Sequence, residues 1–200
     1  MKTVVFASRN RGKIREIRAL LAGLPISLLS LDDFPDAPDV EEDGETFLAN
    51  AQKKALAIAH YTGHPALADD SGLTVDALDG APGVHSARYA GENADDARNI
   101  EKLLREMKNV PKEGRNAAFR CILVICEPDG SCESYEGAWE GIIAETPDGD
   151  GGFGYDPVFY VPALGKTVAR LSLEEKNRLS HRARAFGKFR EALERRLQNR

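Results

Sequence analysis

Helical and extended patterns alternate along this sequence, and that alternation predicts an α/β fold. A short apolar strand pattern at 4–7 is followed by a helical pattern. A second helical pattern precedes the apolar run at 66–68, and two long strand patterns occupy 117–125 and 134–143. The 200 residues suffice for a substantial core, so we expect residues 1–200 to form a single domain, which could consist of two closely packed lobes.

Charge and cysteine content narrow the class of protein. The net charge of −5 and the isoelectric point near 5.5 argue against a general nucleic-acid binder, which needs clustered cations. No apolar run approaches the length of a membrane span, and the N-terminus does not resemble a signal peptide. The three cysteines, Cys121, Cys126 and Cys132, lack a metal-binding spacing. They predict reduced thiols in the cytoplasm, not a disulfide framework or a zinc site.

A turn at residues 8–13 joins the first strand to the first helix, whose apolar residues recur at helical spacing over 14–21. A strand-to-helix turn presents backbone N–H groups at the positive end of the helix dipole, so it can bind an anion. Ser8 and Asn10 add side-chain donors, and Lys13 adds a positive charge. The alternative is an ordinary helix cap with solvated cations.

The next segment is strongly acidic, with eight carboxylates between 32 and 45: Asp32, Asp33, Asp36, Asp39, Glu41, Glu42, Asp43 and Glu45. Such a run is usually a solvated loop. It could instead supply oxygen ligands to Mg²⁺, which typically takes one or two carboxylates plus phosphate oxygens.

The helix that follows, about 46–61, ends near Gly63 and places its two lysines differently. Lys53 points away from the apolar stripe, whereas Lys54 flanks that stripe beside Asn50. Lys54 is therefore the better candidate for a functional site.

The segment 66–73 contains adjacent carboxylates at the end of an apolar run. In an extended strand Asp69 and Asp70 face opposite ways, and each needs its own partner because a buried unpaired carboxylate is too costly. A β-turn is the alternative, since Asp-Asp-Ser-Gly is good turn chemistry. The remaining motifs of the chain favour the functional interpretation.

Further elements complete the α/β pattern. We expect a strand at 73–78 and a helix capped by Asn93 that runs to Met107. In the strand at 117–125, alternate residues form two apolar sets, so both faces should be covered.

The glycine-rich segment 147–157 formally matches G-x-G-x-x-G, but an extended pattern follows it where a dinucleotide-binding motif requires a helix. What remains is a loop that could present the Phe153 ring to a flat ligand. Near the C-terminus, Ser172 begins a capping-box pattern, and Ser180 could cap a second helix. His181 and Arg182 would then lie at a helix N-terminus that can bind an anion. The alternative is that both are surface residues.

Taken together, these motifs resemble a known family. They are Ser8-x-Asn10-x-x-Lys13, Glu41-Glu42, Asn50 with Lys54, Ala68-Asp69-Asp70-Ser71-Gly72-Leu73, Gly80-x-Pro82-Gly83, Ser86-Ala87-Arg88-Tyr89, Gly152-Phe153-Gly154-Tyr155-Asp156-Pro157, Glu175-Lys176-Asn177 and Ser180-His181-Arg182. Their order resembles the ITP/XTP pyrophosphatases, which hydrolyse non-canonical purine nucleoside triphosphates. Ser8 stands where many members have threonine, and the hydroxyl is kept.

The resemblance implies a long central mixed sheet with flanking helices, two lobes around a nucleotide-binding cleft, and a homodimer. It also implies Mg²⁺-dependent hydrolysis of ITP, dITP and XTP to the monophosphate and pyrophosphate, with Asp70 as general base. The implied metal ligands are Glu41, Glu42 and Asp70. The implied phosphate ligands are Ser8, Arg9, Asn10, Arg11, Gly12, Lys13 and Lys54, with Ser71 helping to place the substrate. Phe153 would stack on the purine, in a pocket completed by Gly154, Tyr155, Asp156, Lys176, His181 and Arg182.

Selectivity for these purines would follow from their 6-oxygen, an acceptor where adenine carries an amino donor. Donors such as Arg182 and backbone N–H groups would reject adenine, at roughly 1–3 kcal/mol for each mispaired buried group. Two other hypotheses remain: a pyrophosphatase for other modified nucleotides, and a non-catalytic nucleotide-binding protein. The latter would not need Asp70, Glu41 and Lys13 together.

Overall fold

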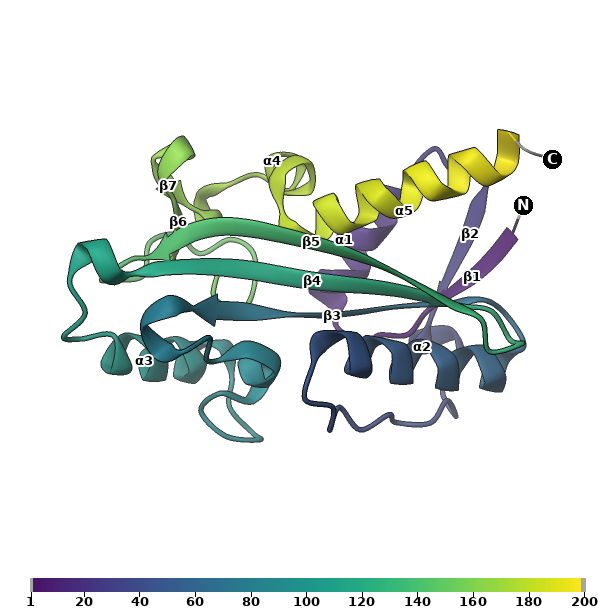
Figure 1. The fold of residues 1–200 in the computed structure, drawn as a ribbon, viewed down its shortest axis with the longest axis horizontal. Coiled ribbons are helices and arrows are strands. Elements are labelled where there is room, and N and C mark those ends of the chain that lie inside the picture. The colour runs from purple at the N-terminus through teal and green to yellow at the C-terminus, as the bar shows by residue number, and fades with distance from the viewer. Residues whose placement is uncertain (1, 199–200) are drawn as a thin grey trace. The chain divides into compact units, whose positions relative to one another are not determined.

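The computed structural model describes residues 2–198 and contains a seven-stranded mixed sheet with flanking helices (Figure 1). The strands are β1 (Lys2–Phe6), β2 (Ile26–Ser30), β3 (Ala66–Val75), β4 (Asn116–Cys126), β5 (Cys132–Ile143), β6 (Phe159–Val161) and β7 (Lys166–Thr167). The helices are α1 (Arg11–Leu21), α2 (Phe47–Thr62), α3 (Asp96–Glu106), α4 (Leu173–Leu179) and α5 (His181–Gln198). The strand order is β2-β1-β3-β4-β5-β6-β7.

Strand directions make the sheet mixed. β1 pairs in parallel with both β2 and β3, whereas β6 is antiparallel to β5 and to β7. The predicted α/β class with a mixed sheet is therefore confirmed. β2 had no predicted counterpart, because its short segment carries no alternating pattern.

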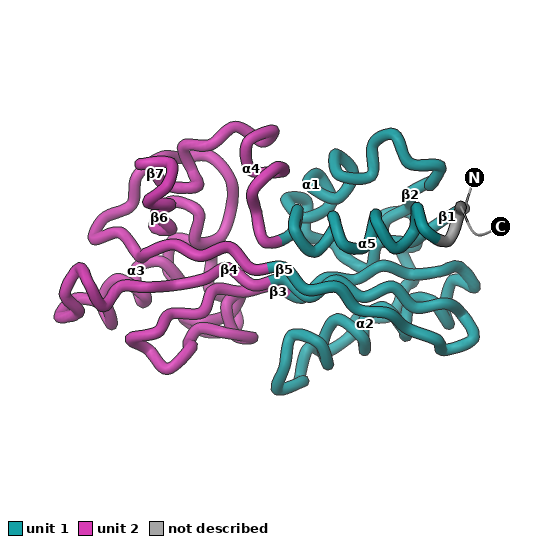
Figure 2. The backbone as a smooth tube through the Cα atoms, turned by 45° about the horizontal axis from the view of Figure 1, so that its top comes forward, with its two compact units in different colours: residues 1–70, 121–137, 182–200 teal, residues 71–120, 138–181 magenta. Residues whose placement is uncertain are grey.

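The chain divides into two compact units, each assembled from separate parts of the sequence (Figure 2). Unit 1 contains the chain up to residue 70, 121–137 and the chain from 182 onward. Unit 2 contains 71–120 and 138–181. Strands β3, β4 and β5 contribute residues to both units.

Unit 1 has a layered core with helices on both faces of its strands. Ile17 of α1 and Phe186 of α5 are buried with Cys121 and Leu123 of β4. Ala55, Ile58 and Ala59 of α2 are buried with Val124 and Cys126, the alternate residues of the same strand. The prediction that both faces of this strand are covered is confirmed, and α2 is thereby held firmly against the strands that carry the candidate site.

Unit 2 is built around one aromatic core. Leu103 of α3 and Met107, the C-cap of that helix, pack with Phe119, Trp139 and Phe159 from the strands. The rings of Phe119 and Phe159 lie 4.3 Å apart between centroids at an interplanar angle of 31°, a close tilted aromatic pair.

Several predicted boundaries are close to those observed. Thr46 caps α2 through its side chain, and Gly63 ends that helix with a φ of +65°. Ser172 forms the predicted capping box at the start of α4. No helix follows Gly154 before β6, so the rejection of a dinucleotide-binding motif is confirmed.

One alternative is excluded and two predicted elements are wrong in detail. Residues 69–72 lie inside β3, so the β-turn alternative is excluded. The strand expected at 73–78 is the end of β3 followed by a short 3-10 helix at Asp76–Leu78. Asp95, not Asn93, caps α3, because the Asp95 side chain accepts the Arg98 N–H.

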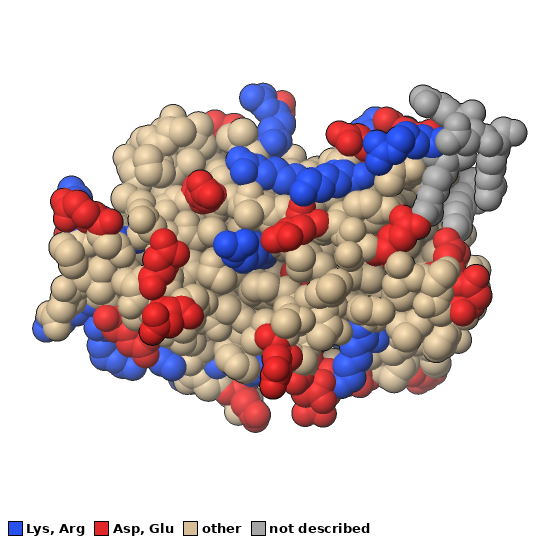
Figure 3. Space-filling model, in the orientation of Figure 1, with Lys and Arg blue, Asp and Glu red and all other residues tan. Residues whose placement is uncertain are grey.

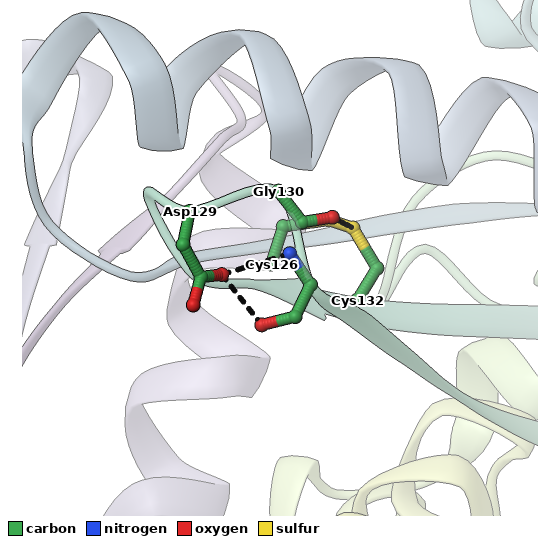
Figure 4. Close-up of a disulfide and its surroundings, with 5 residues drawn as sticks. Cys126, Asp129, Gly130 and Cys132 are labelled. Carbon is green, nitrogen blue, oxygen red and sulfur yellow. Dashed lines mark hydrogen bonds between the residues drawn. A yellow bond between two sulfur atoms is a disulfide. The ribbon is translucent and has the colours of Figure 1, made fainter.

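The expectation of three reduced thiols is also wrong in this structure. A disulfide joins Cys126 and Cys132 across the turn between β4 and β5 (Figure 4). Cys121 is buried and is not part of this disulfide. In that turn Asp129 accepts hydrogen bonds from the backbone N–H and the hydroxyl of Ser131. An odd cysteine count cannot reveal a pair that a hairpin brings to a Cα–Cα distance of 4.1 Å.

The surface shows basic and acidic side chains next to one another (Figure 3). On α5, Arg190 lies 2.9 Å from Glu194, and Arg195 lies 3.9 Å from Glu191. These two pairs place acidic side chains beside two of the cations of that helix. Within residues 2–198, no helix is both long enough and apolar enough to cross a membrane.

Candidate active site

The turn between β1 and α1 is ordered by its own polar groups. The Asn10 side chain caps α1 by accepting the Lys13 N–H at 3.0 Å, and the Ser8 hydroxyl accepts the Asn10 N–H at 3.1 Å. Arg11 and Gly12 are the first residues of α1, where backbone N–H groups lack intrahelical acceptors. The turn therefore has the features of an anion-binding helix start.

The structure places Arg9, a predicted phosphate ligand, against the acidic segment. Its guanidinium donates to the backbone oxygens of Leu31 and Ala37, at 3.5 and 3.4 Å, and lies 3.8 Å from Asp39. Arg9 therefore tethers the acidic segment. Arg11 is exposed on the first turn of α1.

Asp70 is buried in unit 1 among polar groups of α2. Its Oδ2 accepts a hydrogen bond from Asn50 Nδ2 at 3.1 Å, and its Oδ1 lies 3.9 Å from Lys54 Nζ. Burial raises the pKa of Asp70 from its ordinary 3.8 to about 6, although the charges of Lys54 and Lys13 oppose that shift. The carboxyl thus titrates close to neutrality, as a general base requires.

Lys54 is the central cation around Asp70. Its ammonium donates to the backbone oxygen of Asp69 at 2.9 Å and lies 3.1 Å from Glu42 Oε1. Lys53 instead pairs with Asp43 at 2.6 Å on the surface. The prediction from helical spacing that Lys54 flanks the apolar stripe, while Lys53 points away from it, is confirmed.

Asn50 connects the acidic segment to Asp70. Besides donating to Asp70, the fully buried Asn50 accepts the Gly44 N–H at 2.8 Å. A Cβ at Gly44 would lie 2.6 Å from Asn50 Oδ1, so only glycine allows this approach. Sequence reasoning included Asn50 in the family motif without assigning it a role. The sequence signal that could have indicated this role was Gly44, a glycine six residues before Asn50.

Asp69 has separate partners on the other face of β3. Its Oδ1 lies 3.2 Å from Lys13 Nζ, and its Oδ2 accepts Arg182 Nε and Nη2 at 3.2 and 2.9 Å. Arg182 also donates through Nη1 to Glu16. The prediction that the two adjacent carboxylates have different partners is confirmed.

Glu16 is the site residue that sequence reasoning missed. Its side chain is 2% exposed, although it lies on a helix with many charged residues. The signal was its spacing of three from Lys13, which places both side chains on one side of α1. The Arg182 guanidinium donates to the carboxylates of Asp69 and Glu16 through Nε, Nη1 and Nη2.

The two candidate metal ligands of the acidic segment differ in position. Glu42 contacts Lys54, and its charge contributes to the raised pKa of Asp70, whereas Glu41 is exposed. Two carboxylates, Glu42 and Asp70, thus share one ammonium group. Within residues 2–198, no three acidic, histidine or cysteine side chains form a complete metal cage. This donor set suits Mg²⁺, which takes few protein carboxylates and completes its coordination with phosphate and water.

Unit 2 holds a second group of predicted residues around the glycine-rich loop. The Lys176 ammonium lies 2.6 Å from Asp156 Oδ2 and 4.3 Å from the centre of the Phe153 ring. Asp156 Oδ2 also accepts the Phe153 N–H at 2.9 Å. A Cβ at Gly152 would lie 2.0 Å from that carboxylate oxygen. The buried Lys176–Asp156 pair therefore holds the loop around Phe153.

The remaining predicted residues of unit 2 make packing contacts. The Tyr155 hydroxyl donates a hydrogen bond to the backbone oxygen of Ser86 at 2.8 Å, and burial raises the pKa of Tyr155. The His181 ring stacks on Phe119 at 4.9 Å between centroids. Ser71 follows Asp70 directly in β3 and is partly exposed.

Comparison with known proteins identifies the family. The Ham1 family model matches residues 4–192. This chain belongs to the Ham1 family. It is 58% identical over 193 residues to a dITP/XTP pyrophosphatase of Geobacter sulfurreducens, covering 96% of this chain and 97% of that protein. It is 56% identical to a dITP/XTP pyrophosphatase of Geobacillus kaustophilus, covering 97% and 95%.

Solved structures of Ham1 proteins have the same fold. A Ham1 protein from Coxiella burnetii superposes with a TM-score of 0.89 at 45% identity, covering 98% of this chain and all of that one. The Staphylococcus aureus Ham1 protein gives 0.86 at 44% identity, covering 96% and 98%. The resemblance found in the motifs is confirmed.

The raised pKa of Asp70 predicts that this residue destabilises the folded chain at neutral and higher pH. Between pH 3.8 and about 6, Asp70 holds its proton in the folded chain but not in the unfolded chain. The contribution of Asp70 to the free energy of unfolding therefore falls as pH rises through that window. Asp70→Asn removes this destabilisation because the asparagine side chain does not ionise. In EDTA, urea unfolding should show Asp70→Asn more stable than the native chain by about 2–3 kcal/mol at pH 8, and equally stable near pH 4. A variant less stable at pH 8 would contradict this assignment.

Glu16 is predicted to matter for stability. Glu16→Gln removes one of the two carboxylates that neutralise buried Arg182, and breaking such a pair costs about 3 kcal/mol. Urea unfolding at pH 7 should measure this loss. The matched control is Glu191→Gln, which breaks an exposed pair on α5 and should leave unfolding almost unchanged. Equal stability of the two variants would show that the buried pair contributes little.

Proposed function

We propose that this chain hydrolyses non-canonical purine nucleoside triphosphates, namely dITP, ITP and XTP, to the monophosphate and pyrophosphate. The observation that carries the proposal is Asp70, a buried carboxyl with a pKa of about 6, flanked by the Lys54 ammonium. The relatives named dITP/XTP pyrophosphatase, similar over nearly the whole chain, support the substrate class.

In the proposed mechanism Asp70 takes a proton from the water that attacks the α-phosphorus. At neutral pH most Asp70 carboxyls are ionised and can accept that proton, and the Asn50 amide holds the accepting carboxylate in place. Lys13, Lys54 and the N–H groups at the start of α1 bind the phosphates. Their positive charge offsets the repulsion between the triphosphate and an anionic base.

Glu42 and Asp70 are the proposed Mg²⁺ ligands, and Glu41 is not. Glu42 supports this choice because it shares Lys54 with Asp70, while Glu41 is exposed without such a contact. When bound, Mg²⁺ would neutralise negative charge on the phosphates and make the phosphorus easier to attack.

Arg182 is proposed as a positioning residue. Its contacts with Glu16 and Asp69 hold the Asp69 carboxylate, which in turn lies against the Lys13 ammonium. This network keeps Lys13 at the start of α1, where a phosphate would bind. The donors to the purine 6-oxygen would then be backbone N–H groups.

Unit 2 is proposed to bind the purine. Lys176 covers one face of the Phe153 ring, so a base would stack on the opposite face. A 6-oxygen accepts hydrogen bonds where the amino group of adenine would meet donors, at roughly 1–3 kcal/mol for each mispaired group. Several such contacts are needed for strong discrimination.

We further propose that the two units act as one catalytic domain, that the enzyme is a homodimer, and that it works in the cytoplasm without nucleic-acid or membrane partners. These proposals rest on the family resemblance and on the net charge of −5. In a reducing compartment Cys126 and Cys132 would be present as two thiols.

A panel of nucleoside triphosphates tests the function. With Mg²⁺ present, the native chain should convert ITP, dITP and XTP to monophosphate and pyrophosphate much faster than ATP. Asp70→Asn should fold and bind ITP but lose roughly 10²- to 10⁴-fold in turnover, because the proton acceptor is gone. Product analysis by ion-exchange chromatography measures both.

Each outcome of this panel separates the hypotheses. Comparable turnover of ATP and ITP would reject the purine selectivity, and preference for a modified pyrimidine would favour the alternative pyrophosphatase. No turnover with any triphosphate would favour a binding protein. Near-native activity of Asp70→Asn would remove Asp70 as the base.

The metal assignment predicts different behaviour of two neighbouring glutamates. Glu42→Gln should raise the Mg²⁺ concentration needed for half-maximal activity roughly tenfold, because a carboxylate ligand is lost. Glu41→Gln is the matched control and should change it little. The opposite pattern, measured by Mg²⁺ titration of ITP turnover, would assign the ligand to Glu41.

A further inference from the structure

Asp96 lies outside every motif that carries the family resemblance, yet it contacts the glycine-rich loop. We propose that Asp96 is a positioning residue that holds this loop, and with it the Phe153 ring, in the conformation that binds the purine. The inference rests on the proposed function of unit 2. It assigns the specificity of that site partly to α3, an element with no predicted role.

The contact joins two distant parts of unit 2. Asp96 Oδ2 accepts a hydrogen bond from the Gly154 N–H at 2.6 Å, across 58 positions of sequence. A carboxylate is a stronger acceptor than a neutral oxygen, so this bond is charge-assisted. Gly154 has a φ of +62°, a conformation that glycine adopts readily.

This contact completes the attachment of the backbone around Phe153. The Phe153 N–H donates to Asp156, and the next N–H along the chain, that of Gly154, donates to Asp96. Asp156 is buried against Lys176, whereas Asp96 comes from the exposed start of α3. The two successive amides are therefore held by carboxylates from different elements, and Phe153 lies between them.

Helix α3 is itself well anchored, so it can serve as a fixed support. The Asn99 side chain accepts the Ala90 N–H at 2.8 Å and donates to the Ala87 oxygen at 3.2 Å. Lys102 donates to the Tyr89 oxygen at 2.8 Å. Ile100 and Leu103 on the same helix are buried in the core of unit 2.

Helix capping does not account for Asp96. The N-cap of α3 is Asp95, whose Oδ1 accepts the Arg98 N–H at 2.9 Å. Asp96 is the first helical residue, and its carboxylate accepts a hydrogen bond from the glycine-rich loop. The two neighbouring aspartates thus have separable roles, one in the helix end and one in the loop.

Removing the Asp96 carboxylate should loosen the Phe153 backbone without touching the groups proposed for the chemical step in unit 1. Asp96→Ala should raise KM for ITP about three- to tenfold, the effect of one lost hydrogen bond, with kcat within about twofold of native. Asp96→Asn keeps an acceptor oxygen and should restore most of the affinity.

The test compares Asp96→Ala, Asp96→Asn and Asp95→Ala in steady-state ITP hydrolysis with Mg²⁺. Asp95→Ala is the matched control: it removes the cap and lowers the melting temperature, but it should leave KM near native. In addition, calorimetric titration measures the Kd for ITP in Asp70→Asn with and without Asp96→Ala, which needs no turnover.

An unchanged KM and Kd in Asp96→Ala would overturn the inference, as would an equal rise of KM in Asp95→Ala, which would show a general effect of the helix end. A native chain that binds ITP but does not hydrolyse it would reject the proposed function while the Kd comparison still decides the role of Asp96. Absence of ITP binding by the native chain would overturn both.

Discussion

Two adjacent carboxylates in the interior of strand β3 set the main constraint on unit 1. Asp69 and Asp70 are 2% and 4% exposed, and ionised groups at such depth must be compensated. Because neighbouring strand residues face opposite ways, one set of partners cannot serve both. The helices on the two sides of the strand therefore each supply polar partners at this level, and the candidate site is the result.

The compensation is unequal on the two faces, and the difference has chemical meaning. Asp69 and Glu16 are balanced by Arg182 and Lys13, which gives a neutral group suited to positioning. Around Asp70, two carboxylates share Lys54, and burial leaves the Asp70 pKa near 6. A buried carboxyl whose pKa is raised in this way can accept a proton near neutral pH, and its ionised form can bind a divalent cation.

Unit 2 uses a buried ion pair for a different purpose. Lys176 and Asp156 are 5% and 2% exposed, and Asp156 also accepts a loop N–H, so the pair orders a segment rich in glycine. Without such contacts, a loop with so much backbone freedom would lose more entropy on binding a flat ligand. These contacts therefore fix the backbone conformation from which the Phe153 ring projects.

The sequence by itself determined the α/β class, the main helices with the end of α2 at Gly63 and the capping box at Ser172, and the choice of Lys54 over Lys53. These features depend on local spacing, which survives in the sequence because helices and strands have fixed periods. The ordered motifs also identified the family. The tertiary structure decided the rest: the pairing of Cys126 with Cys132, the burial of Glu16, the contacts of Arg182 and the position of Glu42 beside Lys54. Those features depend on which distant residues meet in space, and neither spacing nor composition encodes that.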